Sequence, residues 1–164
     1  MAPKAFIVVV ALLLAACGYH LRGAVDLPDS LKKVYLNGAS MQLREQFRKV
    51  LRGVSGELTT SPEAAGVVIN VANEISDQRV LSLSARGRSN ELELYYRLQY
   101  TLVKADGVVV LEGLPVEIKR EYFNNQQDIV AKDNEQQVIR NEMLQQAVRI
   151  MLDRIRLSLA TDKK

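Results

Sequence analysis

The chain has 164 residues, a formal net charge of +3, one cysteine and one histidine. A charge this small argues against nonspecific nucleic-acid binding. The single cysteine excludes an intramolecular disulfide, and one cysteine with one histidine supplies no cluster of thiolate and imidazole ligands for a metal. The length is that of one domain, and it is sufficient to bury a hydrophobic core without disulfides.

The N-terminus has the pattern of an export signal. Lys4 is followed by an apolar run from Phe6 to Leu14, which is too short for a transmembrane helix of roughly 20 residues. The following Leu-Ala-Ala-Cys17 resembles the lipobox of bacterial lipoproteins. We therefore predict a signal peptide at 1–16 and lipid attachment at Cys17, as covalent N-acyl and S-diacylglycerol groups, with 17–30 as an acylated tether. The alternative is a free buried cysteine behind an ordinary signal.

The first elements of the mature chain are a short strand and a helix. Residues 31–36 are expected to form the strand, which the turn pair Asn37-Gly38 closes. Ser40 is a suitable N-cap, and Gly53 suits the left-handed residue that ends a helix. The apolar residues between them recur at helical spacing: Leu43, Phe47, Val50, Leu51 and Val54.

Extended segments follow. Residues 67–75 and 80–84 have strand character, and 92–102 alternates apolar and polar residues. Ala105-Asp106-Gly107 predicts a hairpin turn, and 108–123 returns as a strand with an irregularity at 113–115. The last three strands are expected to form an antiparallel meander. The first strand would join by a crossover, which makes the sheet mixed.

A final helix completes the predicted fold. Asp133 and Gln136 fit a capping box at its start. Its apolar stripe consists of Val138, Ile139, Met143, Leu144, Ala147, Val148, Met151, Leu152 and Ile155. We therefore predict an α/β two-layer sandwich at 31–160, with an about four-stranded mixed sheet, two helices packed on one face, and a tail at 161–164.

The sequence offers little for catalysis. No glycine-rich phosphate loop opens a helix. A Ser-His-Asp triad would have to use His20, three residues from the predicted anchor, where rigid positioning is difficult. Glu91 and Glu93 share one face of a strand, but no neighbouring pattern predicts the dry cleft that would separate their pKa values. We expect no enzymatic activity; an exported hydrolase that depends on His20 is the alternative.

Two basic features could bind an anion. Arg86 and Arg88 flank Gly87 at a turn between strands, and guanidinium groups match phosphate oxygens in bidentate fashion. Lys132 stands just before the predicted start of the last helix, where unpaired N–H groups also favour an anion. The alternative is that all three are solubilising charges on exposed loops.

Two motifs resemble the LptE lipoproteins of the lipopolysaccharide translocon: Cys17-Gly-Tyr-His-Leu-Arg-Gly23, and Tyr122-Phe-Asn-Asn125 followed by Ala131-Lys-Asp-Asn-Glu-Gln136. The resemblance implies a non-catalytic, lipid-anchored subunit on the periplasmic side of the Gram-negative outer membrane. In that family the lipoprotein plugs the β-barrel of LptD, supports its assembly and contacts lipopolysaccharide. The contacting residues correspond to Lys132 and Arg86, with Arg88 as the alternative arginine. The competing function is a free-standing periplasmic lipoprotein that binds an anionic ligand.

Overall fold

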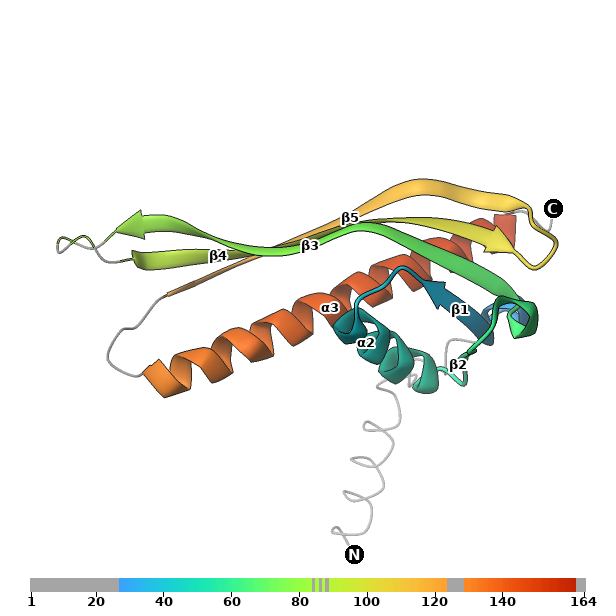
Figure 1. Ribbon diagram of the computed structural model, residues 1–164, viewed down its shortest axis with the longest axis horizontal. Coiled ribbons are helices and arrows are strands. Elements are labelled where there is room, and N and C mark those ends of the chain that lie inside the picture. The colour runs from blue at the N-terminus through green and yellow to red at the C-terminus, as the bar shows by residue number, and fades with distance from the viewer. Residues whose placement is uncertain (1–26, 84, 86, 88, 124–128, 162–164) are drawn as a thin grey trace, which may run out of the picture.

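The computed structural model describes residues 27–83, 85, 87, 89–123 and 129–161, the last range with side chains from residue 134. Five strands form one mixed sheet in the order β2-β1-β3-β4-β5, and two helices lie on one face of it (Figure 1). The elements are β1 (Lys33–Asn37), α2 (Met41–Arg52), β2 (Glu57–Leu58), β3 (Val67–Leu83), β4 (Ser89–Lys104), β5 (Val109–Phe123) and α3 (Ile129–Thr161), with 3-10 turns at Asp29–Leu31 and Pro62–Ala64. The predicted α/β sandwich is confirmed, with one strand more than expected.

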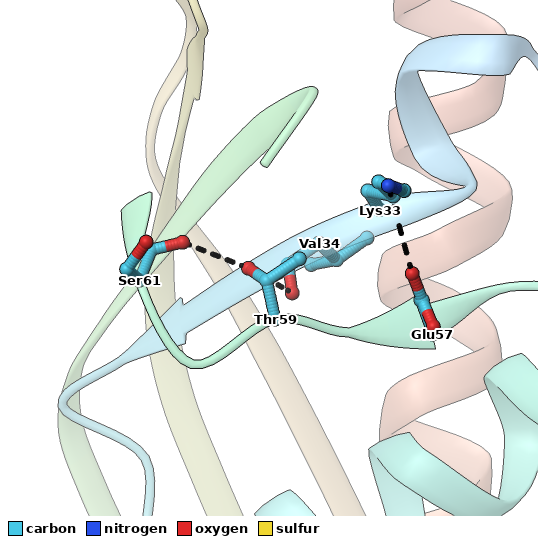
Figure 2. Close-up of polar contacts among 5 residues, drawn as sticks. All are labelled: Lys33, Val34, Glu57, Thr59 and Ser61. Atoms are coloured by element: carbon cyan, nitrogen blue, oxygen red, sulfur yellow. Dashed lines mark hydrogen bonds and ion pairs between the residues drawn. The ribbon is translucent and has the colours of Figure 1, made fainter. Parts of the chain in front are cut away.

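The additional strand is β2, at the edge of the sheet. β1 pairs in parallel with β2 on one side and with β3 on the other, so the predicted crossover and mixed sheet are confirmed. The loop after β2 is fastened to β1 through Thr59, whose hydroxyl donates to the carbonyls of Ser61 (2.9 Å) and Val34 (3.4 Å), as Figure 2 shows. Lys33 and Glu57 face each other across the pair at 3.9 Å (Figure 2). A two-residue strand carries too short a pattern to be recognised in sequence.

The meander of β3, β4 and β5 is confirmed, and it spans the length of the molecule (Figure 1). The predicted alternation in β4 gives one buried row: Leu92, Leu94, Tyr96, Leu98, Tyr100 and Leu102. The β4–β5 turn contains Gly107 at φ 85°, and β5 has an irregularity at Gly113 with φ 59°. β5 is an edge strand, where Pro115 can lack an N–H without loss of a sheet hydrogen bond.

β3 is one continuous strand, where the sequence predicted two separate segments. Its pairing with β4 has a bulge at Asn73 and two further register shifts between Val80 and Leu83. The pairing passes from Ala72 opposite Gln99 to Ile75 opposite Arg97, so two residues of β3 face one residue of β4. Asn73, at φ 53°, adopts the left-handed conformation that asparagine tolerates. Since side chains alternate along a strand, one extra residue exchanges the two faces. Val67, Ile69 and Val71 face the helices before the bulge; Glu74, Ser76 and Gln78 face them after it.

α2 begins as predicted and ends differently. The Ser40 hydroxyl accepts a hydrogen bond from the Leu43 N–H at 3.2 Å, which confirms the N-cap. Gly53, however, has φ −65°, so the predicted left-handed residue at this position is wrong. Its N–H bonds to the Lys49 carbonyl at 3.3 Å and continues the right-handed turn. The chain reaches positive φ only at Ser55.

α3 starts earlier than predicted. It begins at Ile129, so Asp133 is its fifth residue and the predicted capping box is wrong. The apolar stripe is buried from Met143 to Ile155, as expected, and it extends to Leu159. Val138 was expected in this stripe but is 56% exposed. Within the described part of the chain, neither helix combines the length and the apolar character required to span a membrane.

Candidate functional site

The two ends of the molecule differ. The distal end consists of Ile75–Leu83 of β3, Ser89–Tyr96 of β4, Ile118–Phe123 of β5 and Ile129–Asn141 of α3. It lies opposite the packed end, which contains β1, β2, α2, the other halves of the long strands, and α3 from Met143 onward (Figure 1). Both predicted anion-binding features, the β3–β4 turn and the start of α3, belong to the distal end.

The structure describes some of the predicted site residues and not others. Cys17, Arg86 and Arg88 lie outside the described residues. Gly87, between the two arginines, has φ 72°, and a Cβ added there would have no atom within 4 Å. Lys132 is the fourth residue of α3, inside the first turns rather than ahead of a cap. The fold brings the β3–β4 turn and the first turns of α3 to the same end of the molecule, on different elements.

A polar cluster connects α3 to the sheet at the distal end. It consists of Ser76 and Gln78 on β3, Tyr122 on β5, and Gln136 and Arg140 on α3. The Arg140 Nη1 donates to Ser76 Oγ at 2.7 Å. The Gln136 amide lies 2.9 Å from the amide of Gln78 and 3.2 Å from the hydroxyl of Tyr122.

The orientation of the Gln136 amide follows from its neighbours. A guanidinium group can only donate hydrogen bonds, so the amide oxygen belongs on the side of Arg140. In this orientation the oxygen accepts from Nη2 at 2.9 Å and from Nε at 3.2 Å, and the amide nitrogen faces the Tyr122 hydroxyl at 3.2 Å. The same oxygen lies 2.9 Å from the Gln78 amide, so Gln78 turns its NH₂ group toward it and donates. Arg140 thus contacts both β3 and Gln136, and three of its N–H groups are used.

A cavity lies where the distal end meets the packed end. Its volume is about 620 Å³, and it is lined by the start of α2, by β3 beyond the bulge, and by one side of α3. Arg140 of α3 and Glu74 of β3 both line it, and Glu74 is bonded to Ser40 at the start of α2. Arg140 makes no ion pair with any side chain in the described ranges. The cavity lies beside α3 directly before Met143.

Glu74 fixes the junction between the bulge and α2. Its carboxylate accepts from the Ser40 N–H at 2.8 Å, from the Ser40 hydroxyl at 2.7 Å and from the Tyr96 hydroxyl at 2.9 Å. A negative charge at a helix N-terminus is stabilised by the helix dipole. Burial, together with the neighbouring carboxylate of Glu74, raises the pKa of Tyr96 well above its usual range. Tyr96 therefore remains a neutral donor to Glu74.

The sheet face away from the helices, here called the outer face, is polar. Arg79 Nε and Glu93 Oε1 lie 2.7 Å apart, and Lys119 Nζ and Glu117 Oε1 lie 2.8 Å apart. The hydrogen bond between Lys119 and Glu117 lowers the pKa of the Glu117 carboxyl and raises the pKa of the Lys119 ammonium group. The ring of Tyr95 has the charges of Arg97 and Lys119 at 5.8 and 5.5 Å from its centroid. This face is charged, and neither helix covers it (Figure 1).

Apolar side chains are also exposed at the distal end. Val80, Leu81 and Leu83 occupy the last residues of β3 and are 41% to 65% exposed, while Phe123 at the end of β5 is 72% exposed. Together with Val138 on α3, they place apolar surface around the basic turn of residues 85–89 and the start of α3.

Sequence reasoning missed the polar cluster. Gln136 and Arg140 are four residues apart, and Met143, Leu144 and Ala147 continue the same helix face. Two polar residues in line with an apolar stripe were therefore the available signal. Their partners were hidden because the bulge at Asn73 decides which residues of β3 face the helix.

This sandwich, with a long meander and two helices on one face, is the fold of a class of bacterial lipoproteins. The solution structure of an uncharacterized lipoprotein B from Nitrosomonas europaea is 25% identical, with a TM-score of 0.71 over 87% of this chain and 93% of that one. The rare lipoprotein B of Shewanella oneidensis shares the fold at 19% identity, with a TM-score of 0.66 over 80% of this chain and 99% of that one.

The sequence comparisons define the family more narrowly. The family model "LptE: Lipopolysaccharide-assembly" matches residues 31–155. The LPS-assembly lipoprotein LptE of Photorhabdus laumondii is 28% identical over 140 residues, which are 84% of this chain and 76% of the relative. That of Pectobacterium atrosepticum is 25% identical over 151 residues, 88% of this chain and 79% of the relative. The chain therefore belongs to the LptE family, and the resemblance seen in its motifs is confirmed.

Proposed function

We propose that this protein is a non-catalytic outer-membrane lipoprotein that plugs the LptD β-barrel, supports the assembly of that barrel and binds lipopolysaccharide during its transport to the cell surface. The observation that carries the proposal is the family match over 31–155, which spans nearly the whole folded domain. The relatives are named as lipoproteins of lipopolysaccharide assembly.

The outer face supports the role of a plug. The lumen of a large outer-membrane barrel is polar, so a domain that fills it requires a polar exterior. The charged pairs Arg79–Glu93 and Lys119–Glu117 lie on a sheet face that neither helix covers. A face of this kind can form hydrogen bonds and ion pairs with a polar wall without exposing apolar surface to water.

The distal end supports lipopolysaccharide binding. Lipid A carries phosphate groups and acyl chains, so it is recognised by cations next to apolar surface. In the proposal Lys132, with Arg86 or Arg88, binds the phosphates. The exposed side chains of Leu83 and Phe123 lie near these positions in the fold and could contact acyl chains.

The lipid anchor belongs to the same proposal. Acyl chains on Cys17 would tether the domain to the periplasmic side of the outer membrane, where it can enter the barrel lumen. One acyl chain gives only marginal attachment, at roughly 0.8 kcal/mol for each buried methylene, so lasting attachment requires several chains. Mass spectrometry of the mature N-terminus tests the modification directly. An unmodified Cys17 would contradict it.

Co-purification tests the plug. A tagged form of the full chain, extracted in detergent from Gram-negative outer membranes, is expected to elute with a heat-modifiable β-barrel protein in fixed ratio. Elution of the chain alone would contradict the plug and favour the free-standing lipoprotein that binds an anionic ligand.

An affinity measurement tests the lipid site. The double variant Arg86→Asp/Lys132→Asp is expected to bind purified lipopolysaccharide much more weakly than the unaltered chain, most strongly so at low salt, because exposed ion pairs are screened at higher salt. Equal affinity of the two proteins at physiological salt would remove these residues from the proposal.

A further inference from the structure

We propose that the polar cluster of Ser76, Gln78, Tyr122, Gln136 and Arg140 is the positioning element of the lipopolysaccharide site, because it sets the first turns of α3 relative to the β3–β4 turn. The inference rests on the proposed function and adds to it. The phosphate-binding cations would lie on two separate elements, and the polar cluster would determine how far apart those elements stand.

The apolar core holds the first described turns of α3 only weakly, through Ile139, which is partly buried and packs against it. None of the side chains from Asn134 to Asn141 is buried, whereas the stripe that begins at Met143 is. Directly before Met143, the cavity of about 620 Å³ lies beside the helix. Over these residues α3 contacts the sheet through Ile139 and through the hydrogen bonds of Gln136 and Arg140, which are the directional contacts.

Hydrogen bonds suit a positioning role because they are directional. The guanidinium of Arg140 is a rigid fork that uses Nη1 on Ser76 and uses Nη2 and Nε on the oxygen of Gln136. Gln136 in turn contacts Gln78 on β3 and Tyr122 on β5, on opposite sides of β4. Contacts with two strands restrict both the height of α3 above the sheet and its rotation about its own axis.

The polar cluster is close to both parts of the proposed site. Gln136 is four residues from Lys132, about 6 Å along a helix axis at the usual rise per residue. On the sheet side, Gln78 lies in the same strand that ends at Leu83, directly before the β3–β4 turn. A change in the polar cluster can therefore reach both parts, along the first turns of α3 and along the end of β3, where the pairing with β4 has two further register shifts.

The bulge at Asn73 makes this arrangement possible. Without the extra residue, Ile75 and Asp77 would face the helix in place of Ser76 and Gln78. Neither residue type could reproduce the contacts, since isoleucine offers no hydrogen bond and a carboxylate offers no donor to an amide oxygen. The bulge thus gives β3 an apolar inner face at the packed end and a polar one at the distal end.

The test removes the sheet-side partners without changing any charge. We expect Ser76→Ala/Gln78→Ala, in the full chain, to bind purified lipopolysaccharide about threefold to tenfold more weakly, as the loss of two hydrogen bonds allows. Ser82→Ala is the matched control, because Ser82 is on the same strand but bonds Glu91 within the sheet. Ser76→Thr keeps the hydroxyl and should retain the affinity of the unaltered chain.

A distance measurement separates positioning from general stability. Spin labels at Ala85→Cys and Asn134→Cys, in a Cys17→Ser background, occupy exposed positions on the two elements. We expect a narrow distance distribution that Ser76→Ala/Gln78→Ala broadens and Ser82→Ala leaves unchanged. The thermal unfolding midpoints of both variants should equal that of the unaltered chain. Unchanged affinity or an unchanged distribution in the double variant would overturn this inference alone. Failure of the unaltered chain to bind lipopolysaccharide would overturn it together with the proposed lipid site.

Discussion

The packed end and the distal end of this molecule are held together by different forces. At the packed end, α2, α3, β1 and the first half of β3 meet through buried apolar side chains such as Phe47, Ile69 and Ile155. At the distal end β4 and β5 still bury apolar residues, but β3 and α3 meet through the polar cluster. Burial of a large apolar side chain contributes about 1.5–3 kcal/mol, and a hydrogen bond about 0.5–1.5 kcal/mol.

This difference separates stability from recognition. Most of the folding free energy is expected from the packed end, so substitutions at the distal end can change binding without unfolding the domain. The outer face carries the ion pairs Arg79–Glu93 and Lys119–Glu117. We therefore expect a substitution at the packed end to change mainly the free energy of unfolding, and a similar substitution at the distal end to change mainly binding.

The largest contrast is expected between two phenylalanines. Phe47 is fully buried at the packed end and Phe123 is 72% exposed at the distal end. Phe47→Ala should lower the free energy of unfolding by about 3–5 kcal/mol, because it removes buried area and leaves a cavity. Phe123→Ala should change it by less than about 0.5 kcal/mol. Denaturant unfolding of both variants measures the contrast, and similar losses would contradict the division into two ends.

Two glycines with the same backbone conformation give the next contrast. Gly38 and Gly87 have φ 73° and 72°, but a Cβ at Gly38 would lie 2.3 Å from the Val71 carbonyl oxygen, whereas one at Gly87 meets nothing within 4 Å. The left-handed conformation costs a non-glycine residue roughly 1–2 kcal/mol. Gly87→Ala should cost that amount only, while Gly38→Ala should cost about 3 kcal/mol or more. Equal unfolding midpoints for the two variants would be inconsistent with this packing.

The features with a local pattern were the easier part to predict from the sequence. The alternation of β4 and the capping serine of α2 each depend on residues close together in the chain, and both predictions were confirmed. The start of α3 was wrong because Asp133 and Gln136 have the spacing of a capping box, although Gln136 instead contacts the sheet.

The distal end depends on information that a local pattern does not contain. The bulge at Asn73 changes the face of the following residues of β3 as far as Val80, and it follows from pairing with β4. The sheet partner of Arg140, Ser76, is 64 residues away in the chain, on a strand whose facing residues the sequence alone does not define. Cys17, Arg86 and Lys132 came from the family resemblance and the chemistry of their residue types, and they remain predictions.

A smaller effect is expected from pH at the junction of the two ends. Burial and then the Glu74 carboxylate raise the pKa of Tyr96 above its ordinary value of 10.0. In the unfolded chain Tyr96 loses its proton above about pH 10, while in the folded chain it keeps the proton, so the stabilisation it provides is lost as the pH rises. Tyr96→Phe should be about 1 kcal/mol less stable than the unaltered chain at pH 8, through the lost hydrogen bond.

That difference should become smaller by pH 11, because only the unaltered chain is destabilised by ionisation of Tyr96 on unfolding. Denaturant unfolding at the two pH values provides the measurement. A difference that stays constant would mean that Tyr96 ionises equally in the folded and unfolded states.

The most direct test of the account removes two positive charges from each end in turn and compares lipopolysaccharide binding. Arg86→Ala/Lys132→Ala removes two cations from the distal end, and Arg52→Ala/Arg149→Ala removes two exposed cations from the packed end. Titration of each double variant with purified lipopolysaccharide should show at least about tenfold weaker binding for the first pair and a change within about twofold for the second. Equal weakening by both pairs would show that only the net charge matters, and it would contradict a lipopolysaccharide site at the distal end.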